Sequence, residues 1–224
     1  YGLDHLLRIQ NYDGSAHAVV DESHARPPSS ATGPSLYGDV NTVSALAVAS
    51  AFAYSQQAYR AIGMTAYADT LLTRAELAWN WADANPNVIW SNNDAAFGSA
   101  GIAAGQQEVD NYGRLSYKVS AAVYLFEATG DPVYRNFVDA NYEDINMMQW
   151  NFAFPYQQRQ QKVLLHYASL PGSTAAVVND INNTYLNAMN GANNFTAFDN
   201  SVDPYRAHLD TYVWGSNQVK CRKG

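Results

Sequence analysis

Apolar residues recur at intervals of three and four along almost the whole chain, and this spacing limits the possible folds more than any other feature. Tyr134, Phe137 and Val138 follow it in one segment, and residues 178–188 repeat it in another. Such spacing places apolar side chains on one face of an α-helix, whereas period-two alternation marks a strand. Because no period-two run occurs, the sequence predicts an all-α chain without strands.

Helix start signals agree with this periodicity. Asp131 and Asp203 each precede a proline, and Asn41 and Ser173 stand where they can cap two further helices. A capping side chain accepts a hydrogen bond from a free backbone N–H, and proline is tolerated in the first helical turn. The patterns together predict about eight helices, at residues 1–10, 41–62, 65–84, 112–129, 131–146, 153–169, 173–190 and 203–213.

Composition excludes several classes of protein. Charged residues make up 15% of the chain, the net charge is −7, and the one basic cluster lies at residues 220–223, so nucleic acid is not an expected partner. No apolar run reaches the roughly 20 residues that a membrane helix needs. The single Cys221 excludes an intramolecular disulfide and a cysteine-based zinc site.

Two long connections, residues 11–40 and 86–111, exceed the about 12–15 residues of a plain linker and are therefore expected to carry function. Both mix polar side chains with aromatic rings, namely His17, His24, Arg26 and Tyr37 in the first and Trp90, Phe97 and Tyr112 at or just after the second. Rings stack on sugar faces and polar groups hydrogen-bond hydroxyls, so this mixture favours a sugar-binding rim.

Most aromatic residues fall on helical apolar stripes and are expected in the core. Trp90, Trp150 and Trp214 differ, because each lies at a helix end or in a loop beside Asn, Ser or Gln. For these three, the sequence leaves open whether the indole faces a cleft or packs inside.

Several segments resemble glycoside hydrolase family 9 in content and order. The stretch Ala121–Asp131 ends in the family's Ala-Thr-Gly-Asp turn, and Tyr212–Asn217 carries an aromatic-Val-Trp-Gly-Ser-Asn motif. The opening Gly2–Gln10, the Ala-rich helix from Ser44 and the helix from Tyr67 to Trp81 follow the family's order. The resemblance covers nearly the whole chain.

The resemblance implies an (α/α)6 double-layer barrel of twelve helices, of which this chain would supply about eight, as part of a single catalytic domain truncated at both ends. It implies inverting hydrolysis of β-1,4-linked glucans by a secreted enzyme. The family's general base lies in an Asp-Ala-Gly-Asp motif and its acid in an Asn-Glu motif, and neither occurs in these 224 residues. We therefore expect no catalytic residue in this chain, and we expect other polypeptide to supply the remaining helices.

The resemblance also selects candidate substrate-binding residues. Trp150 and Trp214 match family tryptophans that contact the glycan. His24 and Arg26 lie in the loop that lines the cleft in relatives, although surface polar groups are the competing interpretation. Trp90 and Tyr112 complete the predicted set.

Many relatives hold a structural calcium ion, and here Ser116, Tyr117 and Pro155 stand at the positions of its three carboxylate ligands. Calcium needs several oxygen ligands, mostly charged, so the chain is expected to have no cofactor and no metal. Lys118 is a candidate to supply positive charge in its place.

Other functions have weaker support. Glu108 with Asp110, or Asp21 with Glu22, would be a catalytic pair within the chain, but neighbouring loop carboxylates are usually solvated or capping groups. No Gly-x-Ser-x-Gly elbow and no His-x-x-x-His spacing occurs. A non-catalytic carbohydrate-binding barrel, or a lyase or epimerase on the same kind of barrel, remain the alternatives.

Overall fold

The computed structural model describes residues 2–21, 30, 32–33, 36–102, 108–154 and 156–191. Its described part is mainly helical, which confirms the all-α class. The chain divides into two compact units, Tyr1–Thr129 and Gly130–Gly224, and each described part has a buried core of its own. That residues 1–224 belong to a single catalytic domain stays a prediction.

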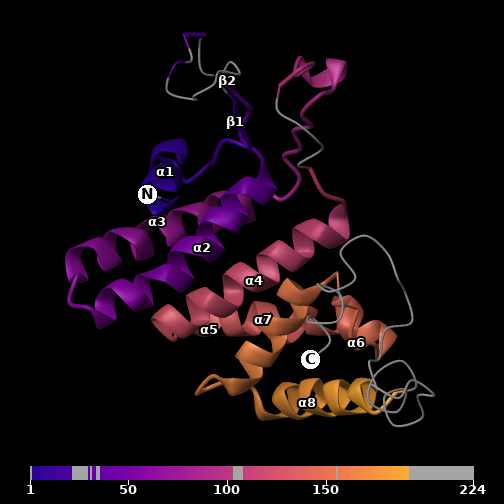
Figure 1. Ribbon diagram of the computed structural model, residues 1–224. Helices are drawn as coiled ribbons and strands as arrows, with labels where there is room; N and C mark the ends of the chain where they lie inside the picture. Colours follow the sequence, from indigo (N-terminus) through magenta and orange to yellow (C-terminus); the bar gives the residue numbers. More distant parts are fainter. Residues whose placement is uncertain are drawn as a thin grey trace, which may run out of the picture. The chain divides into compact units, whose positions relative to one another are not determined.

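The first unit is built on three long helices (Figure 1). Its elements are α1 (Gly2–Ile9), β1 (Val20–Asp21), β2 (Leu36–Tyr37), α2 (Thr42–Ala61), α3 (Thr65–Ala84), the 3-10 turn η2 (Ala95–Phe97) and α4 (Asn111–Thr129). The predicted helix 65–84 has the bounds of α3. The helix predicted at 41–62 is one residue longer than α2 at each end, and the helix predicted at 112–129 begins one residue after α4 does.

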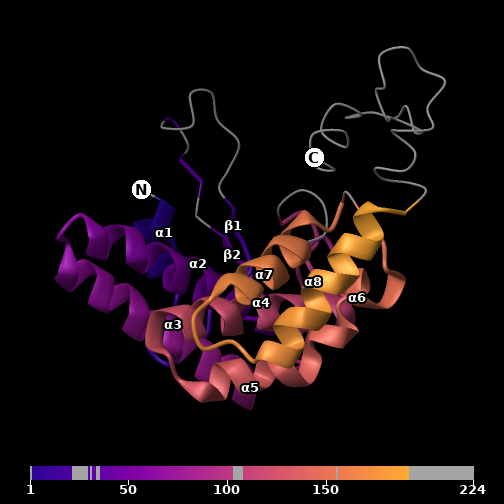
Figure 2. The ribbon, with the colours of Figure 1, turned by 90° about the horizontal axis from the view of Figure 1, so that it is seen from below.

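Helix α2 packs against both α3 and α4 (Figures 1 and 2). Its buried side is mostly small, with Ala45, Ala49 and Ala53 fully buried around Leu46 and Phe52. Small side chains allow two neighbouring helices to approach closely while the larger ones interlock. Asn41 caps α2 as predicted, because its Oδ1 accepts a hydrogen bond from the Ser44 backbone N–H at 2.7 Å.

The end of α1 is tied to α3 by reciprocal hydrogen bonds. Gln10 Nε2 donates to the carbonyl of Arg74 at 2.8 Å, and Arg74 Nη2 donates to the carbonyl of Gln10 at 2.7 Å. The next turn brings Gly14, with φ of +97°, directly onto the α3 backbone at Leu77. This turn therefore fits only a residue without a side chain.

A two-residue antiparallel ladder corrects the expectation of a strand-free chain. β1 pairs with β2 in the register Val20 to Tyr37 and Asp21 to Leu36, and an isolated bridge joins His17 to Val40. Two-residue strands are too short to show a period in the sequence. The ladder brings the two sides of the first long connection together and leaves the fold class unchanged.

The second unit contains shorter helices. They are α5 (Pro132–Asn141), the 3-10 turn η3 (Tyr142–Asp144), α6 (Asn146–Trp150), α7 (Gln158–Ser169) and α8 (Ala175–Met189). Asp131 caps α5 as predicted, since its Oδ1 accepts from the Val133 N–H at 2.9 Å. The predicted helix 203–213, with its cap at Asp203, lies outside the described residues.

Three predictions about this unit were wrong. The helix predicted at 131–146 breaks at Tyr142, whose hydroxyl donates to Asp180 at 2.9 Å, and continues as η3 and α6. The helix predicted from 153 begins at Gln158, because Phe154 precedes a proline and so avoids the helical conformation. Ser173 does not cap α8, because its hydroxyl donates to the carbonyl of Tyr167 at 2.7 Å.

Tyr167 is the centre of a polar network in this core. It is fully buried, and its hydroxyl and that of Thr174 donate to the two carboxylate oxygens of Asp139 on α5. Burial, followed by the hydrogen bond to Asp139, raises the pKa of Tyr167 to about 12. The network joins α5 to α7 and to the turn between α7 and α8.

The raised pKa predicts loss of stability at alkaline pH. A phenol with a pKa near 10 when unfolded and about 12 when folded stabilises the fold fully below pH 10, and this contribution is lost as pH rises through 12. We expect Tyr167→Phe to lower the free energy of unfolding by about 1–2 kcal/mol at pH 8. Between pH 10 and 12, the free energy of unfolding of the variant should then fall less than that of the unchanged chain. Urea titrations at each pH measure this.

The control for this prediction is Tyr12→Phe, since Tyr12 is 96% exposed. It should unfold like the unchanged chain at every pH. Equal pH slopes for Tyr167→Phe and the unchanged chain would contradict the assigned role of Tyr167.

None of the helices in the described residues combines the length and apolar character that a membrane-spanning segment requires. This agrees with the absence of a long apolar run in the sequence.

Candidate carbohydrate-binding site

Glu108 joins three segments of the first unit at the start of α4. Its carboxylate accepts hydrogen bonds from the backbone N–H of Trp90 at 3.0 Å and from Asn41 Nδ2 at 3.2 Å. It also forms an ion pair with Arg114 Nη1 at 3.2 Å, and both side chains are about nine-tenths buried. Glu108 therefore fixes the second long connection and the α2 cap to α4.

The contacts of Glu108 and Asp110 favour structural roles for these residues over the alternative of a catalytic pair. Glu108 Oε1 also accepts from the Val109 N–H at 2.9 Å, so both carboxylate oxygens are engaged by donors of the protein. Asp110 Oδ1 accepts from the Gly113 N–H at 2.7 Å, the geometry of a helix cap. The pair has structural roles, and the alternative pair of Asp21 with Glu22 has its side chains outside the described residues.

The indole of Trp90 is 3% exposed. Its six-membered ring lies so close to Gly38 that a Cβ atom there would be 2.6 Å from the ring. In this arrangement Trp90 packs the two long connections together and offers no face to a sugar. Tyr112 is half-buried in the first turn of α4. The binding roles predicted for both stay predictions, and packing is the role that the contacts of Trp90 support.

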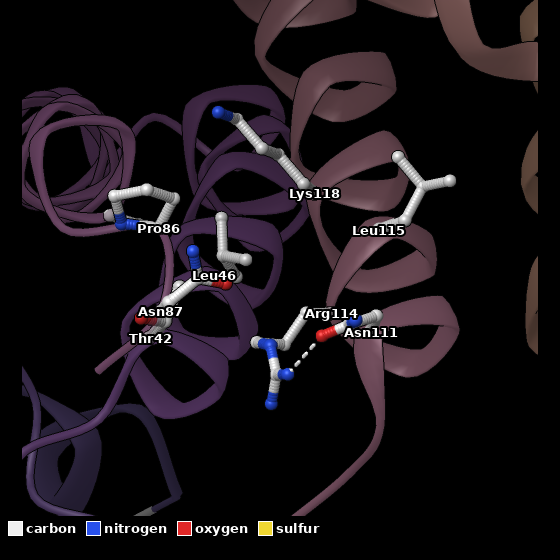
Figure 3. A pocket seen from close by; sticks show the side chains of 9 residues that line it. Thr42, Leu46, Pro86, Asn87, Asn111, Arg114, Leu115 and Lys118 are labelled. Carbon is white, nitrogen blue, oxygen red and sulfur yellow. Dashed lines mark hydrogen bonds between the residues drawn. The ribbon is translucent and has the colours of Figure 1, made fainter. Parts of the chain in front are cut away.

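A pocket of about 210 Å³, lined by both polar and apolar residues, opens beside this cluster (Figure 3). It is lined by Thr42, Leu46, Ala82, Pro86, Asn87, Asn111, Arg114, Leu115 and Lys118. Its two cations are neutralised within the same unit, Arg114 by Glu108 and Lys118 by Asp83. The pocket therefore offers hydrogen-bonding groups without a strong net charge.

In the second unit, Trp150 is the last residue of α6 and is 50% exposed. Its ring meets that of Phe154 edge to face, with centroids 6.1 Å apart. Phe154 in turn lies 5.4 Å from the ring of Tyr156, which is 54% exposed. Trp150 thus has the exposure that a sugar-stacking residue needs, and it belongs to an aromatic group that sequence reasoning did not identify.

The other predicted binding residues, His24, Arg26 and Trp214, lie outside the described residues, as does Pro155. Their assignments stay predictions.

Two of the residues predicted at the family's calcium positions, Ser116 and Tyr117, lie in α4. Ser116 is 1% exposed, and its hydroxyl donates to the carbonyl of Gly113 at 2.8 Å. Tyr117 brings a neutral phenol where a carboxylate is needed. The ammonium group of Lys118 forms an ion pair with Asp83, and its Nζ lies 5.2 Å from the Trp79 ring centroid. Both of these partners belong to α3.

Comparison with known proteins identifies the class. Residues 1–223 match the model of glycosyl hydrolase family 9, so the chain belongs to this family. The fold is similar to that of a metagenome-derived glycoside hydrolase family 9 endoglucanase, with a TM-score of 0.76 and 20% identity over 100% of this chain and 39% of that chain. None of the curated proteins matches the sequence.

Two further solved structures agree. A single-mutant thermostable endoglucanase from Alicyclobacillus acidocaldarius gives a TM-score of 0.72 and 16% identity, over 99% of this chain and 40% of that chain. A family 9 protein from Bacteroides ovatus gives a TM-score of 0.70 and 16% identity, over 95% of this chain and 39% of that chain. The chain thus spans about two-fifths of these structures, and it forms part of an (α/α)6 barrel, as the resemblance implied.

Proposed function

We propose that this chain is part of an enzyme that hydrolyses β-1,4-glucosidic bonds in cellulose or a related β-glucan, and that the enzyme acts outside the cell. The observation that carries the proposal is the family match over residues 1–223, together with the fold shared with endoglucanases. The exposed Trp150 supports it, because an open indole at a helix end provides a stacking surface for a pyranose ring.

In the proposed reaction, one carboxylate deprotonates a water molecule and a protonated carboxyl group delivers its proton to the leaving oxygen. An inverting enzyme holds these two groups about 6.5–9.5 Å apart. Because the family's two catalytic motifs do not occur in this sequence, the role of this chain is to bind and orient the glucan. Glu108 and Arg114 would contribute by fixing the long connections.

We further propose that this chain does not hold the family's calcium ion. The proposal rests on Ser116 and Tyr117, because neither has the carboxylate that calcium prefers as a ligand. A calcium ion within bonding distance of a Ser116 oxygen would contradict this.

Substitution of Trp150 tests the proposed substrate. Trp150→Ala should weaken the binding of β-1,4-glucan oligosaccharides about fivefold or more, because truncating a tryptophan in a binding site commonly costs over 1 kcal/mol. Isothermal titration calorimetry measures the dissociation constant. Tyr12→Ala removes a still more exposed ring in the first unit and should bind normally. An unchanged dissociation constant for Trp150→Ala would count against the proposal.

A further inference from the structure

Trp150, Phe154 and Tyr156 form one continuous aromatic strip between α6 and α7. The middle ring, Phe154, is half-buried and lies 6.1 Å from Trp150 and 5.4 Å from Tyr156 between centroids. The two outer rings are each about half exposed. Both outer rings are therefore accessible, and Phe154 holds them apart by contact with each.

The backbone under the strip is held by hydrogen bonds. The carbonyl of Phe154 accepts from Gln161 Nε2 at 2.6 Å and from the Gln157 N–H at 3.0 Å. At the other end, Asn151 ends α6 in the left-handed conformation, with φ of +48°. These backbone contacts reduce the conformational entropy that the segment would lose when a ligand binds.

We propose that Tyr156 is a second sugar-stacking residue, which contacts the glucan chain beyond the unit stacked on Trp150. This inference rests on the proposed function, because it takes the same ligand. The centroid spacings are comparable to the length of one pyranose ring. Because Phe154 lies between the outer rings, an extended β-linked chain that crosses the strip would bring different sugar units to Trp150 and Tyr156.

Neighbouring polar residues fit the same ligand. Gln149 and Asn151, on either side of Trp150, are both exposed. Amide side chains donate and accept hydrogen bonds, as sugar hydroxyls do. Exposed aromatic faces flanked by amides are suited to a carbohydrate, whereas a purely apolar partner would leave the amides without a role.

Three substitutions in the full chain test the inference. Tyr156→Leu keeps an apolar side chain but removes the aromatic face, Tyr156→Phe keeps the face, and Tyr12→Leu is the control at an exposed tyrosine. Calorimetry is run with β-1,4-glucan oligosaccharides of increasing length. We expect Tyr156→Leu to raise the dissociation constant for the longer oligosaccharides about threefold to tenfold. The dissociation constant for the shortest oligosaccharide that binds should stay the same. Tyr156→Phe and Tyr12→Leu should bind normally.

The outcomes separate this inference from the proposed function. Normal binding by Tyr156→Leu, with weakened binding by Trp150→Ala, overturns the role of Tyr156 and leaves the proposed function intact. Equally weakened binding by Tyr156→Leu and Tyr156→Phe also overturns it. The loss of affinity would then not depend on the presence of the aromatic ring. If the unchanged chain binds no β-1,4-glucan oligosaccharide, both proposals fail.

Discussion

Replacement of Gly14 by alanine is expected to lower the free energy of unfolding by about 3 kcal/mol or more, through backbone strain combined with overpacking. A Cβ atom at this position would lie 2.1 Å from the carbonyl oxygen of Leu77 and 2.5 Å from its carbon. Both atoms belong to the backbone of α3, so no side chain can rotate to make room. The φ of +97° adds strain for any residue with a side chain.

Gly63→Ala is the matched control for this substitution. Gly63 also has a positive φ, +81°, but no atom lies within 4 Å of the position that its Cβ would take. We expect a loss of about 1 kcal/mol, from the left-handed conformation alone. Urea unfolding followed by circular dichroism measures both variants. Similar losses for the two would show that the contact with Leu77 is unimportant.

Arg114→Ala is expected to destabilise the chain by about 3–5 kcal/mol, since it leaves the carboxylate of Glu108 buried without its cation. The guanidinium also donates to the carbonyl of Val109 at 2.7 Å and to Asn111 Oδ1, so the start of α4 loses several bonds at once. The second long connection should become more mobile as a result. Faster hydrogen exchange at the Trp90 amide, which donates to Glu108, would report this.

Arg60→Ala provides the comparison for an exposed ion pair. Arg60 pairs with Asp69 at 2.7 Å, but the two side chains are 43% and 61% exposed. Exposed pairs contribute roughly 0–1 kcal/mol, so this variant should unfold nearly like the unchanged chain. A loss for Arg114→Ala as small as that for Arg60→Ala would contradict the role given to the Glu108 cluster.

Local signals were enough to predict most helices. The caps at Asn41 and Asp131 depend on residues within three positions, and the bounds of α3 follow from an uninterrupted apolar spacing. The predictions were wrong where distant partners decide the structure. Asp180 binds the Tyr142 hydroxyl across 38 positions, near the break of the predicted helix, and no local pattern around Tyr142 reveals it.

The candidate site was predictable to a smaller extent. Trp150 was identified by family resemblance, and the structure places it at an exposed position. Tyr156 stands six residues away, but its relation to Trp150 depends on how the chain turns after α6. The contacts of Glu108 join positions 41, 90, 108 and 114, which only the tertiary structure brings together. Burial of Trp90 against Gly38 has the same long-range origin.

We propose that these helices belong to a β-glucan hydrolase whose catalytic carboxylates lie on segments other than residues 1–224. Incubation of the purified 224-residue chain with cellulose and β-1,4-glucan oligosaccharides, followed by chromatography of the released sugars, tests it most directly. We expect binding that depends on Trp150 and no release of cellobiose above the buffer control. Release of cellobiose by this chain alone, in proportion to its concentration, would contradict the account.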